Sequence, residues 1–183
     1  IDDANIRSLV LRTLRTLDMS AYGNYPVGGP YRKSDLAKIT TLEIANNITN
    51  LTGLESFSGL KKLDLNPKGP TTLDLSAMQE LEEITLRGTM QTITGSNVSL
   101  KKVVLKENRN VTKLDLRGFR NIEKVFIEEQ TQTPKHIECI AVPDNKVEEV
   151  KASINITAGG GNADLARQKT EFYRSKVQST PCN

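Results

Sequence analysis

Apolar residues recur in one short pattern along the middle of the chain. The segments LKKLDL, LEEITL, LKKVVL and IEKVFI begin at Leu60, Leu81, Leu100 and Ile122, so the pattern returns about every 20 residues. In each segment the first, fourth and sixth positions are apolar. The alternation over the last three positions predicts a short β-strand whose fourth and sixth side chains face a core.

One such unit cannot bury its apolar face alone, so neighbouring units must stack. We therefore expect an α/β leucine-rich repeat solenoid, a right-handed coil with a parallel sheet on its concave face. Two further copies of the pattern are expected, one with Ile39, Leu42 and Ile44 and one with Ile137, Ile140 and Val142. The return segments Thr71–Ser76 and Val111–Leu116 also look strand-like, so some coils are expected to carry strands on both faces.

The two ends of the chain have helical patterns instead. Apolar residues at helical spacing predict a helix over Ile1–Leu17, with Asp2 or Asp3 as its cap, and Ser34 is expected to cap a second short helix. We expect a further helical stretch over Asp144–Ala152, and a last helix over Ala163–Val177 with an apolar stripe of Leu165, Phe172 and Val177. The expected organisation is a helical N-terminal cap (1–38), the repeats (39–151) and a C-terminal tail with a helical cap (152–183).

Composition narrows the class of protein. Apolar residues make up 37% and charged residues 26% of the 183 residues, which is enough for one core, and the net charge is only +3. Because this charge is mild and forms no dominant basic cluster, nucleic acid is not an expected partner. No apolar run approaches the roughly 20 residues of a membrane helix. The sequence starts at Ile1 rather than Met, so we expect a mature or trimmed form whose signal and anchor, such as a lipoprotein signal, lie outside it.

Several segments resemble one known family. DANIRSLVLRTL, LTGLESFSGLKKLDL and IAVPDNKVEEVK are similar to the cap helix, the cap-to-repeat junction and the closing strand and helix of bacterial cell-surface leucine-rich repeat proteins of the internalin-like type. The resemblance implies a secreted or surface-anchored module, extracellular and non-catalytic, that binds host proteins, glycans or neighbouring surface proteins. Members often have a calcium-type DTNGDG loop after the cap helix. Here that place reads LDMSAYGNYPVGG without alternating carboxylates, so we expect no metal and no cofactor.

Equivalent positions of parallel strands form columns across a sheet. The second position reads Thr40, Lys61, Glu82, Lys101, Glu123 and Glu138, and its four residues from Lys61 to Glu123 form an alternating charge ladder. The third position reads Thr41, Lys62, Glu83, Lys102, Lys124 and Cys139. The ladder is interpreted first as a solvated set of ion pairs, and alternatively as a platform for a charged ligand. The fifth position, which faces outward, changes from acidic to apolar along the array: Glu43, Asp64, Thr85, Val104, Phe126 and Ala141.

An exposed aromatic with apolar neighbours is typical of a partner site. The candidate ligand-binding face is Glu43, Asp64, Lys62, Thr85, Val104, Lys102, Lys124 and Phe126. The alternative is that the C-terminal tail folds over Val104 and Phe126.

Signals for catalysis are weak. His136, the only histidine, is interpreted as a surface loop residue, and the Gly159–Gly161 run as a linker, because it lacks the Lys-Ser/Thr of a phosphate-binding loop. Cys139 and Cys182 are expected to form one disulfide, with two free thiols as the alternative. The Asn-x-Ser/Thr triplets at Asn47, Asn50, Asn97, Asn110 and Asn155 are interpreted as coincidental.

These observations favour a monomeric, non-catalytic adhesion or interaction module that binds a protein or glycan through the concave face. The alternative is a structural spacer domain of a larger cell-surface protein. An enzyme is the least favoured class, because no catalytic constellation is marked in the sequence.

Overall fold

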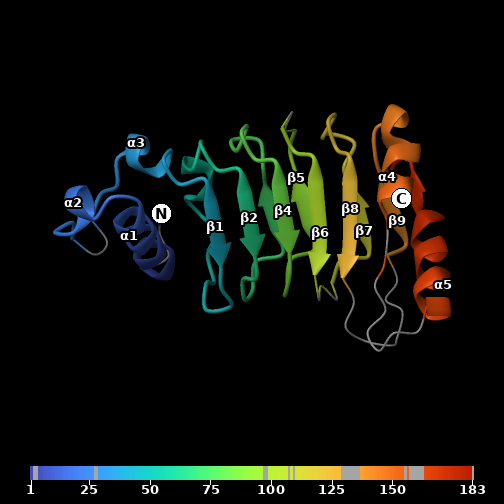
Figure 1. Cartoon of the computed structure of the whole chain (residues 1–183), viewed down its shortest axis with the longest axis horizontal. Coiled ribbons are helices and arrows are strands. Elements are labelled where there is room, and N and C mark those ends of the chain that lie inside the picture. Colours follow the sequence, from blue (N-terminus) through green and yellow to red (C-terminus); the bar gives the residue numbers. More distant parts are fainter. Residues whose placement is uncertain are drawn as a thin grey trace.

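The repeated apolar pattern forms parallel strands in the computed structural model, which describes residues 1, 4–26, 29–96, 99–106, 108, 110–128, 137–154, 156 and 163–182. Within these residues one sheet contains five strands in the order β1, β2, β4, β6 and β8 (Figure 1). We call it the front sheet, and its strands are β1 (Thr41–Ile44), β2 (Lys62–Leu65), β4 (Glu83–Leu86), β6 (Lys102–Lys106) and β8 (Lys124–Glu128). Each strand pairs in parallel with the equivalent strand of the next coil, which confirms the leucine-rich repeat solenoid.

The return segments carry short strands of their own. On this back face β3 (Thr72–Asp74) pairs with β5 (Thr92–Thr94), and β7 (Lys113–Asp115) pairs with β9 (Cys139–Ala141). A final strand, β10 (Val177–Gln178), pairs with the other side of β9. The expectation of strands on both faces is therefore confirmed for the coils that contain β3, β5 and β7.

The core lies between the two faces. The fourth position of the repeated pattern is occupied by Leu42, Leu63, Ile84, Val103 and Val125, and each of these side chains is at most 2% exposed. The register places each of them directly beside its counterpart on the next strand. Burying one such side chain contributes about 1.5–3 kcal/mol, so the column contributes a large share of the stability of the stack.

Helices close the N-terminal end of the stack. Helix α1 (Ala4–Leu17) buries Ile6, Val10, Leu11 and Leu14. The segment after α1 contains a short helix, α2 (Met19–Tyr22), whose start is capped by the Asp18 side chain, which accepts a hydrogen bond from the Ala21 amide. Helix α3 (Lys33–Leu36) begins one residue before Ser34, with Arg32 as its N-cap, so the expected capping role of Ser34 is wrong. Asp2 and Asp3 lie outside the described residues.

The segment Ile137–Val142 differs from its prediction. It was expected to form a further front strand, but β9 aligns with β7 on the back face, with Cys139 beside Lys113 and Ala141 beside Asp115. The segment is therefore the return leg of the last coil, whose apolar pattern resembles that of a front strand. Ile137 also follows Ile122 at a shorter spacing than any two neighbouring front patterns. Glu138, Cys139 and Ala141 consequently do not belong to the front columns.

A helix covers the last edge of the front sheet. After β9 come a 3-10 turn, η2 (Asp144–Lys146), and α4 (Val147–Ser153), as the sequence predicted. Helix α4 packs beside β8 (Figure 1). The Val125 amide donates a hydrogen bond to Ser153 Oγ at 3.0 Å. The edge of the sheet is thereby closed by a helix in place of another strand, a common way to prevent edge-to-edge association.

The residues that the C-terminal helix buries in the core differ from the predicted apolar stripe. Helix α5 (Ala163–Arg174) ends before Val177, which lies in β10. Tyr173 is fully buried, whereas Phe172 is 36% exposed. The expected stripe of Leu165, Phe172 and Val177 is therefore wrong, because the chain leaves the helix between Phe172 and Val177 and turns into a strand.

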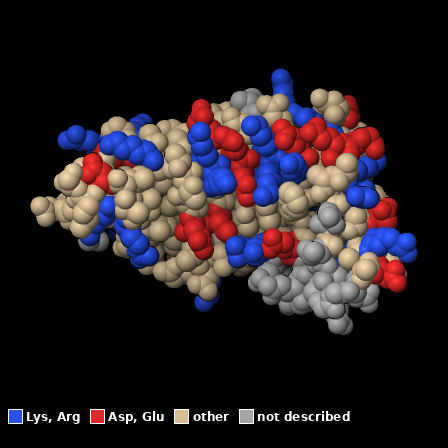
Figure 2. Space-filling model, in the orientation of Figure 1, with Lys and Arg blue, Asp and Glu red and all other residues tan. Residues whose placement is uncertain are grey.

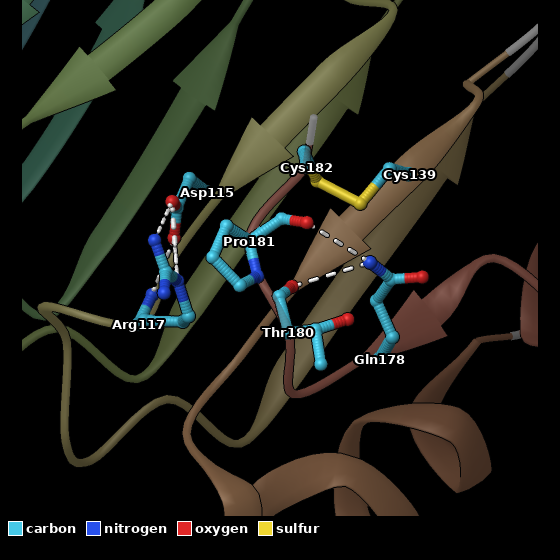
Figure 3. Close-up of a disulfide and its surroundings, with 7 residues drawn as sticks. All are labelled: Asp115, Arg117, Cys139, Gln178, Thr180, Pro181 and Cys182. Atoms are coloured by element: carbon cyan, nitrogen blue, oxygen red, sulfur yellow. Dashed lines mark hydrogen bonds and ion pairs between the residues drawn. A yellow bond between two sulfur atoms is a disulfide. The ribbon is translucent and has the colours of Figure 1, made fainter.

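Cys139 and Cys182 are joined in the structure, with their Cα atoms 5.7 Å apart (Figure 3). The bond connects β9 to the segment after β10. Gln178 Nε2 donates to the carbonyl oxygens of Thr180 and Pro181 at 3.2 Å each, which folds the intervening residues into a tight turn. The last residues of the tail are thus fixed against the edge of the back face.

A core substitution tests the stacking. We expect Ile84→Ala to lower the free energy of unfolding by about 2–5 kcal/mol, because it opens a cavity in a fully buried column. The exposed control Lys101→Ala should change it by less than about 0.5 kcal/mol. Urea unfolding followed by circular dichroism measures both. Equal effects of the two substitutions would show that Ile84 is not in a shared core.

The disulfide has its own test. Intact mass should show no alkylation of the unreduced, denatured protein and two alkylated thiols after reduction. The double substitution of Cys139 and Cys182 by Ser should lower the free energy of unfolding by about 2–4 kcal/mol, since the bond closes a long loop. Two alkylatable thiols without reductant would contradict the bond.

Candidate functional site

The outward-facing positions of the front sheet form a regular grid. Because side chains alternate along a strand, the third, fifth and seventh positions of the pattern face out together. The register aligns the expected fifth-position column as Glu43, Asp64, Thr85, Val104 and Phe126. Lys62, Glu83, Lys102 and Lys124 form the neighbouring column. The structure thus brings all eight candidate residues onto one face, and the ligand-binding role of that face stays a prediction.

Ion pairs occupy much of this grid. Arg87 makes two parallel hydrogen bonds to Asp64, from Nε to Oδ1 at 2.9 Å and from Nη2 to Oδ2 at 2.7 Å. Lys102 Nζ lies 3.0 Å from Glu83 Oε1, and Lys106 Nζ lies 2.9 Å from Glu128 Oε2. Figure 2 shows the result as acidic and basic side chains interleaved across the front sheet.

The charge ladder at the second position is looser. Glu82 lies between Lys61 and Lys101, with nitrogen-to-oxygen distances of 4.0 and 3.9 Å and largely exposed side chains. Exposed pairs of this kind contribute about 0–1 kcal/mol each. The geometry fits the interpretation of a solvated ladder better than that of a charged platform.

An apolar strip interrupts the charges near the C-terminal end of the sheet. It consists of Thr85, Val104 and Phe126, which are neighbours across β4, β6 and β8. We call it the Val104–Phe126 strip. Val104 is only 7% exposed although it points outward, and Phe126 is half-buried. The strip is therefore a shallow apolar patch with one accessible aromatic ring.

Lysines surround this strip. Lys102 Nζ lies 5.0 Å from the centroid of the Phe126 ring, a cation–π distance. Lys106 is on the same strand as Val104, and Lys124 is on the same strand as Phe126. No ion pair or hydrogen bond of the Lys124 ammonium group occurs among the described residues. Since Lys102 is paired with Glu83 and Lys106 with Glu128, Lys124 is the lysine of these two strands without an ion pair among the described residues, and it gives this half of the face a basic surplus.

The described part of the tail packs on the back face and at the C-terminal end of the stack (Figure 1). Strand β10 pairs with β9 on the back face, and α4 packs at the edge beside β8. The alternative in which the tail covers the Val104–Phe126 strip concerns residues 152–183, of which Asn155, 157–162 and Asn183 are outside the described residues. The described residues 163–182 give the tail another place to pack.

Sequence reasoning missed the residues that neutralise the grid. Arg87, Lys106 and Glu128 occupy the seventh position, one step beyond the recognised pattern. The same alternation that placed the third and fifth positions outward would have placed the seventh position outward too. Their effect is to pair Asp64 and to frame the apolar strip.

Chemistry beyond binding has little support in the described residues. No group of three or more His, Cys, Asp or Glu is placed to hold a metal ion there, and His136 lies outside the described residues.

The shifted pKa values have structural causes. Ser20 and the Ala21 amide lower the pKa of Asp18 through hydrogen bonds at the start of α2, and hydrogen bonding to Arg117 lowers the pKa of Asp115. Of the described helices, none is long and apolar enough to cross a membrane.

Comparison with known proteins gives distant likenesses only. No protein-family model matches the sequence, and no curated protein is similar to it. Among solved structures, internalin C2 from Listeria monocytogenes is 15% identical with a TM-score of 0.36, and the match covers 86% of this chain and 88% of that one. An internalin F from the same species is 11% identical with a TM-score of 0.33, covering 97% of this chain and 75% of that one. The solenoid architecture therefore rests on the register of this chain's own strands.

Proposed function

We propose that the chain is a non-catalytic interaction module that binds a protein or a glycan through its front sheet. The observation that carries the proposal is the Val104–Phe126 strip, an apolar patch with a half-buried aromatic ring inside a grid of charged side chains. Binding energy at interfaces concentrates at such aromatic anchors, which polar neighbours shield from water. The ion-paired remainder of the sheet would supply orientation more than affinity.

The basic surplus on β6 and β8 indicates the chemical character of the partner surface. Lys124 lies beside Lys102 and makes no ion pair among the described residues, and the ammonium group of Lys102 is shared between Glu83 and the Phe126 ring. An acidic partner surface with an apolar or sugar-ring contact would complement this arrangement, since opposite potentials favour encounter and register.

The chemistry of the tail supports an extracellular location. A disulfide persists in oxidising compartments and is rare in the cytosol, so the Cys139–Cys182 bond supports an exported protein. Adhesion at a cell surface is the role we propose for such an exported module.

A structural spacer is the second candidate. The Asp64–Arg87, Glu83–Lys102 and Lys106–Glu128 pairs neutralise most of the front face, as expected for a surface that only has to stay soluble. The two functions differ in one respect: a spacer has no use for the exposed ring of Phe126.

Substitution of Phe126 tests the choice. A panel of purified extracellular-matrix proteins and an immobilised glycan array first identifies a binder of the wild-type protein. Phe126→Ala is then expected to weaken binding by about tenfold or more, as for an aromatic anchor, with little change in melting temperature because the side chain is only half-buried. Biolayer interferometry and thermal unfolding measure the two effects.

The control is another lysine-covered phenylalanine. Phe172 is 36% exposed, and Lys176 Nζ lies 4.7 Å from its ring centroid, but it lies on α5 away from the front sheet. Phe172→Ala should leave binding unchanged. Equal weakening by both substitutions, or no binder on the panel, would contradict the interaction role, and a large loss of stability in Phe126→Ala would place that ring in the core.

A further inference from the structure

The back face has an open strand edge near the N-terminal end of the coil. Strand β3 pairs with β5 on one side. On its other side lies the return segment of the first coil, which contains only the 3-10 turn η1 (Leu54–Ser56). Among the described residues no strand pairs with this side of β3.

The direction of the backbone groups on β3 follows from its bonds to β5. The Thr92 amide donates to the carbonyl of Thr71 at 3.0 Å, and the Leu75 amide donates to the carbonyl of Thr94 at 3.0 Å. A parallel ladder bonds to one neighbour through alternate residues. Thr71 and Leu75 therefore face β5, and the amides and carbonyls of Thr72 and Asp74 face the open side. No backbone partner for them on that side is found within the described residues.

A groove of about 540 Å³ follows this edge. Leu51 and Leu73, each 8% exposed, contribute apolar surface to its lining. Glu55 and Asp74 also line it, and none of the described lysines and arginines does. Hydrogen bonds from the side chain and amide of Ser76 lower the pKa of Asp74, so its carboxylate is charged at neutral pH. The groove combines unpaired backbone groups, an apolar surface and negative charge.

We propose that this edge binds an extended, basic segment of a partner protein, which adds to β3 as another strand. Exposed strand edges bind peptides through main-chain hydrogen bonds, while alternate side chains fill pockets and give specificity. The amides and carbonyls of Thr72 and Asp74 supply the hydrogen bonds. Apolar side chains of the segment contact Leu51 and Leu73, and its basic side chains lie near Glu55 and Asp74. This surface is separate from the front sheet, so it does not depend on the function proposed above.

The probe is a fluorescein-labelled eight-residue peptide of alternating valine and lysine, measured by fluorescence anisotropy. Thr72→Pro removes an amide on the open side and leaves the bonds of Thr71 and Leu75 to β5 in place. We expect it to weaken binding by about tenfold or more, because it deletes one main-chain bond and places a ring on the edge. Thr72→Ala changes only the side chain and should bind like the wild type.

A matched pair of variants tests whether the negative charge of Asp74 contributes to peptide binding. Asp74→Asn keeps the oxygen that accepts the Ser76 amide and loses the charge, and it is expected to weaken binding severalfold. Asp115 occupies the same LDL context on β7, but β7 lies between two neighbouring return strands, with β5 in contact on the side that is open in β3 and β9 paired on the other side. Asp115→Asn should leave the affinity unchanged. A peptide with glutamate in place of lysine should bind far more weakly.

The proposal would be overturned if the valine–lysine peptide did not bind the wild type, or if Thr72→Pro bound it as tightly as the wild type does. It would also be overturned if Asp74→Asn and Asp115→Asn weakened binding equally, or if the glutamate peptide bound the wild type as tightly as the lysine peptide. If Thr72→Pro does not fold, hydrogen exchange of the wild type decides. The amides of Thr72 and Asp74 should exchange faster than that of Leu75 in the unliganded protein and slow down when the peptide is added. If the exchange rates of the Thr72 and Asp74 amides did not change when the peptide was added, the proposal would also be overturned.

Discussion

The fold depends on burial of aliphatic side chains that no single coil could bury alone. Leu42, Leu63, Ile84, Val103 and Val125 lie side by side across the front sheet, and each is almost fully buried by its neighbours above and below. Because strand side chains alternate with a period of two, a slip of one residue would turn this column to solvent. The core therefore fixes the register, and the register in turn fixes every outward column.

Both proposed binding surfaces follow from that register. On the front, it places Val104 beside Phe126 and surrounds them with lysines, while the Asp64–Arg87 pair neutralises the earlier strands. On the back, it leaves β3 as the first strand, with an acidic groove on its open side. The ends of the stack are closed differently: helices cover the first coil, and α4 and the disulfide-linked tail cover the last. At the C-terminal end α4 covers the last front strand, β8, whereas no described strand pairs with the first side of β3.

Most of the front sheet could be predicted from the sequence because the pattern repeats the same residue classes at the same positions. The inward column and the order of Glu43, Asp64, Thr85, Val104 and Phe126 follow from alternation alone. The place of Ile137–Val142 could not be predicted in the same way, because a return strand has the same alternating apolar pattern as a front strand. Only pairing with β7 distinguishes the two.

The site was harder to predict than the fold. Alternation gave the direction of each side chain, but the pairing of Arg87 with Asp64 depends on long side chains reaching diagonally between strands. The packing of α5 through Tyr173 depends on where the helix ends, which its weak apolar stripe did not indicate. The open edge of β3 could not be predicted from the sequence, because residue types do not show which backbone groups lack a hydrogen-bonding partner.

Methyl–methyl nuclear Overhauser contacts test the shared core most directly. With selectively labelled isoleucine, leucine and valine methyl groups, we predict contacts between Leu63 and Ile84, between Ile84 and Val103, and between Val103 and Val125, in that order along the stack. Absence of these contacts in a folded sample, or contacts that pair these residues in another order, would contradict the stacked-coil account and the two surfaces that depend on it.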